Sequence, residues 1–184
     1  MNAGKSTSML QSSYNYQERG MNTLIFTSSL DDRFKSGYVC SRIGISSKAE
    51  VYGSDTSFLD VVLTKNHQLK IDCVLVDEAQ FLSKDQVVEL AKIVDIHNIP
   101  VLCYGLRTDF RANLFTGSQY LLALADKIIE LKGICFCGKK ATMTLRVDLD
   151  AKSVSFDGKQ VVIGDNDIYH SVCRLHFYKS QISY

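Results

Sequence analysis

The sequence predicts an α/β protein with a mainly parallel sheet and a small β-rich addition near the C-terminus. Short apolar segments with the length of buried strands alternate with segments of helical periodicity, which is the pattern of βαβ units. After residue 131 the pattern changes to alternating strands, a turn signal and clustered cysteines. A chain of 184 residues has the length of one domain, or of one domain with a small appendage. We therefore expect one domain over residues 1–132 and a second over 133–184.

Four short apolar segments are expected to be strands covered on both faces, because their apolarity is nearly continuous and not strictly alternating. They are residues 23–27, 73–76, 101–104 and 127–131. Three helices are expected between or before them, at 6–19, 83–97 and 117–126. Gly20 ends the first helix, and Ser83 is a suitable N-cap for the second. In the last part of the chain we expect strands at 141–147 and 160–163, with a turn at Asp157-Gly158.

The composition is that of an ordinary globular protein, with 46% hydrophobic and 22% charged residues. The 21 Lys and Arg residues nearly balance the 20 Asp and Glu residues, so the net charge of +1 gives no general attraction to nucleic acid or anionic membrane. No apolar run approaches the ~20 residues of a membrane span, and no signal peptide opens the chain. We expect a cytoplasmic protein without a nucleic-acid or membrane partner.

The motif Ala3-Gly4-Lys5-Ser6-Thr7 opens the first expected helix and matches the second half of a P-loop. In such a loop the backbone N–H groups surround phosphate oxygens at a helix N-terminus, the lysine reaches the β- and γ-phosphates, and the serine hydroxyl binds Mg²⁺. The alternative is a chance helix cap, which the position before a helix disfavours. The first glycine of the motif and the strand that precedes it would lie before Met1, so we expect this chain to lack them.

An apolar strand that ends in Asp77 and Glu78 has the pattern of a Walker B motif. Asp77 would hold Mg²⁺ through water, and Glu78 could take a proton from an attacking hydroxyl. The alternative is an acidic pair near the start of the next helix, which helices favour. Glu78 itself has two interpretations, as the base for a substrate hydroxyl or as the activator of water in an ATPase.

Three cysteines and one histidine cluster in the C-terminal part as Cys135-x-Cys137 and Cys173-x-x-His176. Three thiolates and an imidazole form a closed tetrahedral ligand set, which is typical of structural zinc. The alternative is a set of unrelated buried cysteines, and the C-x-C spacing is tighter than the usual C-x₂-C.

In this order along the chain, the P-loop half, Asp31-Asp32-Arg33, Asp77-Glu78-Ala79-Gln80-Phe81, the segment 104–110 (Tyr-Gly-Leu-Arg-Thr-Asp-Phe) and the terminal cysteine set resemble the cytosolic, zinc-containing thymidine kinases, closest to enterobacterial-type members. The resemblance spans nearly the whole chain. It implies a RecA-like P-loop core, and a zinc-binding domain with a lasso loop that covers the base. It also implies transfer of the γ-phosphoryl group of ATP to the 5′-hydroxyl of thymidine, and usually of deoxyuridine, in nucleotide salvage.

The resemblance also implies roles for individual residues. ATP and its phosphates would be bound by Met1, Asn2, Ala3, Gly4, Lys5, Ser6, Thr7, Asp31, Arg33, Asp77 and Gln80. Mg²⁺ would be bound by Ser6 and Asp77, zinc by Cys135, Cys137, Cys173 and His176, and Glu78 would be the catalytic base. The nucleoside would be bound by Phe81, Leu106, Phe110, Thr144, Val162, Ile163, Gly164 and Tyr169. Such enzymes usually form homotetramers and are inhibited by thymidine triphosphate.

Other functions are weighed against this one. A RecA-type P-loop ATPase with a structural zinc element is expected to carry a basic stripe facing DNA, which the dispersed Lys and Arg do not provide. A zinc-stabilised nucleic-acid module needs aromatic residues interleaved with arginine. A nucleoside monophosphate kinase needs an arginine-rich lid, and none is evident in the sequence.

Overall fold

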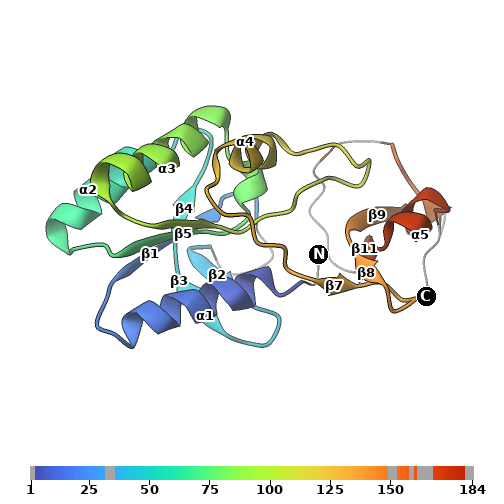
Figure 1. Cartoon of the computed structure of the whole chain (residues 1–184), viewed down its shortest axis with the longest axis horizontal. Coiled ribbons are helices and arrows are strands. Elements are labelled where there is room, and N and C mark those ends of the chain that lie inside the picture. Colours follow the sequence, from blue (N-terminus) through green and yellow to red (C-terminus); the bar gives the residue numbers. More distant parts are fainter. Residues whose placement is uncertain (1–2, 32–35, 149–152, 158–159, 161–167, 181–184) are drawn as a thin grey trace.

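The computed structural model describes residues 3–31, 36–148, 153–157, 160 and 168–180 (Figure 1). Its main sheet has the strand order β4-β1-β5-β6, and every neighbouring pair in it is parallel. These strands are β1 (Thr23–Ser28), β4 (Glu50–Tyr52), β5 (Cys73–Val76) and β6 (Val101–Cys103). The parallel α/β architecture predicted from the sequence is confirmed.

Helices cover both faces of this sheet (Figure 1). On one face lies α1 (Lys5–Gln17), and on the other lie α2 (Phe58–Gln68) and α3 (Lys84–His97), with α4 (Thr116–Leu124) beside the short 3₁₀ helix η1 (Ala79–Phe81). The expected helices at 6–19, 83–97 and 117–126 are present as α1, α3 and α4, with ends displaced by a few residues.

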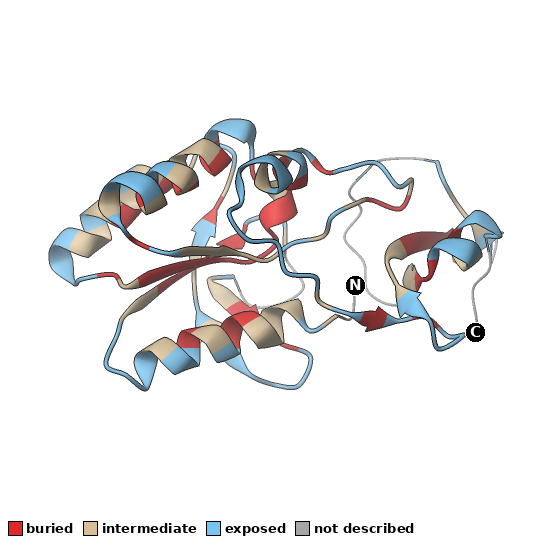
Figure 2. Cartoon of the chain, viewed as in Figure 1, coloured by how far each residue is buried: buried red, intermediate tan, exposed pale blue. Residues whose placement is uncertain are grey.

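The sheet has two separate cores because side chains alternate between its faces along each strand. Phe26 and Val76 point to the α2 and α3 side, where they pack with Phe58 and other apolar residues. Ile25 and Leu75 belong to the opposite cluster, which includes Met9 and Leu10 of α1. Figure 2 shows the resulting red band of buried residues along the central strands.

The prediction of a strand at residues 127–131 is wrong. This segment carries no strand, and Ile128 and Ile129 are 62% and 69% exposed. A strand needs a neighbour for its backbone N–H and C=O groups. Within the described residues, β6 pairs only with β5 and forms the edge of the sheet, so residues 127–131 do not pair with the free side of β6.

The C-terminal part builds a small antiparallel structure of its own. The strands β10 (Ser153–Val154), β9 (Met143–Asp148) and β11 (Tyr169–Val172) form a sheet, and β7 (Gly133–Ile134) pairs with β8 (Lys140–Ala141). A short helix, α5 (Arg174–Tyr178), packs on β9. The core of this part consists of Cys135, Leu145, Val172, Cys173 and Phe177. The strand expected at 141–147 is present as β9 from Met143, whereas Ala141 belongs to β8 in the other sheet; the strand expected at 160–163 lies mostly outside the described residues.

A further hairpin, β2 (Tyr38–Cys40) with β3 (Ser46–Lys48), lies between β1 and β4 along the chain. The division into domains at residue 132 stays a prediction, which the separate core of the C-terminal part supports. Across the described residues, the helices are too short or too polar to span a bilayer.

Gly117 lets α4 lie directly against η1. A Cβ at this position would be 2.5 Å from the carbonyl oxygen of Ala79 and 2.8 Å from that of Gln80, which are backbone atoms and cannot turn aside. Gly117→Ala is therefore expected to lower the free energy of unfolding by about 1–3 kcal/mol, as overpacking does. Urea unfolding measures this effect. Gly53→Ala is the matched control, because its Cβ would meet only the Ser29 hydroxyl at 3.4 Å, and equal losses in both variants would contradict the prediction.

Candidate active site and metal centre

The predicted P-loop half and the predicted Walker B motif meet at the carboxyl end of β5. The Ser6 hydroxyl, in the first turn of α1, donates to Asp77 Oδ2 at 2.9 Å. Gly4 precedes the helix with a φ of +73°, which glycine adopts without a steric penalty. Both predicted Mg²⁺-binding side chains are thus in contact, although they are 71 residues apart in the sequence.

Asp77 is almost fully buried at 3% exposure. Burial is the largest cause that raises its pKa, and the neighbouring charge of Glu78 raises it further, to about 6. The Lys5 charge and the hydrogen bond from Ser6 act in the opposite direction. The negative charge of this carboxylate is therefore only partly compensated by its protein neighbours. A buried, poorly compensated carboxylate attracts a divalent cation strongly.

Glu78 has an unusual backbone for a residue with a side chain. Its φ is +52°, in the left-handed region, which costs on the order of 1–3 kcal/mol at non-glycine positions and is concentrated at functional sites. The buried Tyr52 hydroxyl donates to the Glu78 carbonyl oxygen at 2.9 Å. The carboxylate accepts a hydrogen bond from Gln80 Nε2 at 2.5 Å. Both ends of Glu78 are held by buried neighbours.

The predicted nucleoside-binding residues fall into two groups. Phe81, at the end of η1, packs edge-to-face on Phe115 at a centroid distance of 6.0 Å. Leu106 follows β6, and its N–H donates to Gln80 Oε1 at 3.0 Å. This first group therefore lies next to Glu78.

The second group lies where the C-terminal sheet meets the segment after β6. Thr144 and Arg146 share one face of β9. Tyr169, on β11, lies directly opposite Arg146 in the sheet. The Arg146 guanidinium lies 3.9 Å from the centroid of the Phe110 ring, and Arg111 lies 4.9 Å from it. Phe110 is only 1% exposed, so its contact with a nucleoside stays a prediction.

The other predicted phosphate-binding residues that the structure describes lie at the end of β1 and at the start of α1. Asp31 follows β1, and its N–H donates to the Ser28 carbonyl oxygen at 3.1 Å. Ala3 precedes α1, and Thr7 lies in its first turn. Outside the described residues lie Met1, Asn2, Arg33, Val162, Ile163 and Gly164.

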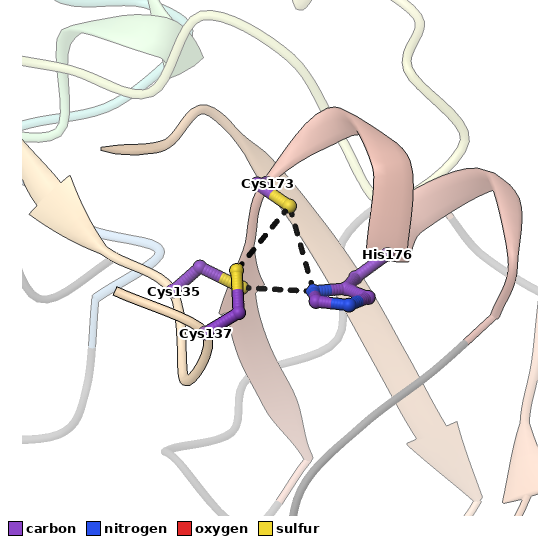
Figure 3. Close-up of side chains that lie close together, drawn as sticks. All are labelled: Cys135, Cys137, Cys173 and His176. Carbon is purple, nitrogen blue, oxygen red and sulfur yellow. Dashed lines mark hydrogen bonds between the residues drawn. The ribbon is translucent and has the colours of Figure 1, made fainter. Parts of the chain in front are cut away.

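Cys135, Cys137, Cys173 and His176 gather at one point, between the β7–β8 turn and the start of α5 (Figure 3). Their ligand atoms all lie within 4.8 Å of one another. The Cys137 and Cys173 sulfurs are 3.9 Å apart, and His176 Nδ1 lies 3.3 Å from Cys135 Sγ and 3.5 Å from Cys173 Sγ. Tetrahedral zinc with Zn–S of about 2.3 Å places its sulfurs roughly 3.8 Å apart, so this set fits zinc.

The chemistry of the cluster also suits a metal. Burial raises the pKa of Cys135, but hydrogen bonds from the Cys137 backbone and from His176 outweigh it and lower this pKa to about 6. A thiolate is the form that binds a metal ion. The ring of Phe136 stacks on that of His176 with 4.3 Å between centroids, which fixes the imidazole plane. The described residues therefore could hold a zinc ion with three sulfurs and one nitrogen.

Known proteins resemble this chain over nearly its whole length. A sequence model of the thymidine kinase family matches residues 1–177. The chain belongs to the thymidine kinase family. It is 59% identical over 177 residues to the curated thymidine kinases of Escherichia coli (strain K12) and Shigella flexneri, and 58% identical to that of Salmonella typhimurium. Each alignment covers 96% of this chain and 86% of the relative.

Membership of the thymidine kinase family makes the chain a kinase, which uses ATP, and disfavours the ATPase and the nucleic-acid module. Two residues of its candidate site were missed by the sequence reasoning. Tyr52 lies in the three-residue strand β4, whose sequence has no apolar run that would predict a strand. Its hydroxyl donates to the backbone carbonyl oxygen of Glu78. Arg146 looks like an ordinary charged position of an exposed strand, yet it is 8% exposed and covers Phe110.

Because the pKa of Asp77 is raised, the free energy of unfolding of this chain is expected to depend on pH. Because this pKa is about 6 in the folded chain and ordinarily 3.8, the folded state binds the proton more tightly, and stability falls as the pH rises through that window. Asp77→Asn is expected to be more stable than the ligand-free wild type at pH 7 by about 1–3 kcal/mol. The difference should shrink towards pH 4.

Chemical unfolding of both proteins at several pH values without Mg²⁺ or nucleotide measures this difference. An asparagine can still accept from the Glu78 N–H, as Asp77 Oδ1 does at 3.0 Å, so the variant keeps that contact. A variant that is less stable than the wild type at pH 8 would contradict the prediction.

Proposed function

We propose that this chain is a thymidine kinase that transfers the γ-phosphoryl group of ATP to the 5′-hydroxyl of thymidine, and also of deoxyuridine, in nucleotide salvage. The contact between Ser6 and Asp77, with Glu78 beside it, carries the proposal together with the family membership. A phosphate-binding helix start, a buried acid and a second acid thus meet at one point, which is the arrangement that phosphoryl transfer needs.

Glu78 is the general base of the proposed reaction. It accepts the proton of the 5′-hydroxyl while that oxygen forms a bond to the γ-phosphorus. The bond between the γ-phosphorus and the oxygen that bridges it to the β-phosphorus breaks, and ADP leaves with that oxygen. The proton on Glu78 then passes to solvent.

The other charged groups stabilise the transferred phosphoryl group. Lys5 would neutralise charge on the β- and γ-phosphates, and by the family resemblance Asp31 and Arg33 are proposed to act near these phosphates. Ser6 and Asp77 would hold Mg²⁺, which would supply positive charge to neutralise the charge on the transferred phosphoryl group. The backbone N–H groups that begin α1 bind the phosphates as helix N-termini do.

The nucleoside would lie between the two groups of predicted residues. Phe81 and Leu106 lie next to the general base, Glu78. Thr144, Tyr169 and Phe110 lie on the side of the C-terminal sheet. Residues 162–164 would cover thymine from the lasso and exclude water, so that the nucleoside and not water is phosphorylated.

Zinc in the Cys₃His site would be structural, because four protein ligands leave no open position. By family membership we also propose a homotetramer that is inhibited by thymidine triphosphate. We also propose a cytoplasmic location, on the same family membership.

The experiment that tests the function is ADP formation from Mg-ATP with and without thymidine, with thymidine monophosphate measured as the second product. Equal amounts of ADP and thymidine monophosphate, formed only with thymidine, are expected. ADP formed at the same rate without thymidine would favour a RecA-type ATPase, in which Glu78 activates water.

A further inference from the structure

The Glu78 carboxylate is held by the buried side chain of Gln80. This residue lies two positions later in η1 and is 2% exposed. Its Nε2 donates to Glu78 Oε2 at 2.5 Å, and its Oε1 accepts from the Leu106 N–H at 3.0 Å. Because a backbone N–H can only donate, the amide oxygen must face Leu106 and the amide nitrogen must face Glu78.

The amide of Gln80 is fixed by close packing of the segment after β6. A Cβ at Gly105 would lie 2.9 Å from the backbone nitrogen of Gln80 and 3.0 Å from Gln80 Oε1, so this approach requires glycine. The next residue, Leu106, is also held from α4, where the Ser118 hydroxyl donates to the Leu106 carbonyl oxygen at 2.5 Å. The amide therefore links the Glu78 carboxylate to a firmly packed piece of backbone.

From this geometry we infer that Gln80 is a positioning residue for phosphoryl transfer, which orients the Glu78 carboxylate towards the acceptor hydroxyl. Its amide donates to one carboxylate oxygen and so fixes the rotation of the carboxylate, which sets the direction from which that group can accept the hydroxyl proton. This inference rests on the proposed function of Glu78. It differs from the family-based expectation that Gln80 binds ATP, because its amide oxygen and nitrogen are both engaged within the protein.

The first test compares Gln80→Met with Gln86→Met. Methionine has nearly the shape of glutamine but neither hydrogen bond. Gln86, in the capping box of α3, is a matched control. It is 4% exposed, and its Nε2 donates to the carbonyl oxygens of Gly53 and Thr56. We expect Gln80→Met to lower kcat by about 10²-fold, with little change in KM for ATP. Gln86→Met should lower stability and leave kcat near that of the wild type.

The second test is the pH dependence of Gln80→Glu. The introduced carboxyl group keeps the acceptor for Leu106 and, when protonated, can donate to Glu78 as the amide does. Two adjacent carboxylates retain one proton to higher pH than a single one. The ratio of variant to wild-type kcat is therefore expected to rise as the pH falls from 9 to 6, which a merely structural role would not produce.

The third test places the substitution in the Glu78→Gln background. If Gln80 acts through Glu78, adding Gln80→Met there lowers the residual kcat no further, because interacting residues are not additive. A further fall of tenfold would overturn the inference, as would wild-type kcat in Gln80→Met or a flat ratio for Gln80→Glu. If Glu78→Gln itself kept full activity, the proposed function of Glu78 would fail, and not only the role of Gln80.

Discussion

Glu78→Gln is expected to lower kcat for thymidine phosphorylation by about 10²–10⁴, the usual contribution of a general base. The substitution keeps the size of the side chain and the backbone contact with Tyr52, which uses the carbonyl oxygen of residue 78. It removes the group that accepts the hydroxyl proton. Steady-state rates at saturating ATP and thymidine measure the effect, and KM for ATP should change little because the phosphates are bound elsewhere.

A matched substitution separates the loss of the base from the loss of a negative charge. Glu130 is an exposed acid that pairs with Lys140 on the surface, and such pairs contribute little. Glu130→Gln should therefore keep wild-type kcat. If Glu78→Gln were as active as Glu130→Gln, the base would have to be another residue. If it lost ATP hydrolysis without thymidine as well as transfer, the ATPase interpretation would gain support.

Cys173→Ser is expected to remove bound zinc and destabilise the C-terminal part strongly. This sulfur lies within 3.9 Å of Cys137 Sγ and 3.5 Å of His176 Nδ1, so its loss opens the ligand set. Among the described residues of this part, one core cluster contains five buried residues, two of which are themselves cysteines of the proposed metal site. Apparent zinc-binding free energies in small domains reach on the order of 10 kcal/mol, and much of that becomes folding free energy.

Zinc content by elemental mass spectrometry and thermal unfolding measure this prediction. The wild type treated with a strong chelator should unfold like the variant. Cys40→Ser is the control, because Cys40 lies in β2 outside the cluster and should leave one zinc per chain. A Cys173→Ser protein that retained one zinc per chain and the wild-type melting temperature would show that this residue is not a ligand.

Loss of zinc should also weaken thymidine binding. Thr144 and Tyr169 lie on the two paired strands of the same small sheet, and the second of these strands runs directly into Cys173. If that sheet loses its metal, the predicted nucleoside-binding face is no longer fixed, so KM for thymidine should rise more than KM for ATP.

The sequence predicted the parts of the fold that local patterns encode. Apolar β-branched runs and 3.6-residue periodicity located β1, β5, β6, α1, α3 and α4. The same reasoning failed at residues 127–131, because an apolar run becomes a strand only where the chain path lays it against another strand, and this segment is not laid against β6. It also missed β2 to β4 and α2, whose short or weakly apolar sequences give no strong local signal.

For the site, the sequence by itself determined the candidate chemistry: a helix start with the P-loop pattern, two adjacent acids after a strand, and four residues of the types that bind zinc. Their residue types and spacings are local, so they can be read without coordinates. Only the tertiary structure decided which groups hold Glu78, namely the Tyr52 hydroxyl on its carbonyl oxygen and the Gln80 amide on its carboxylate. It also placed the Leu106 backbone behind Gln80. Such contacts depend on how the ends of separate strands pack at one edge of the sheet, and no local pattern records that packing.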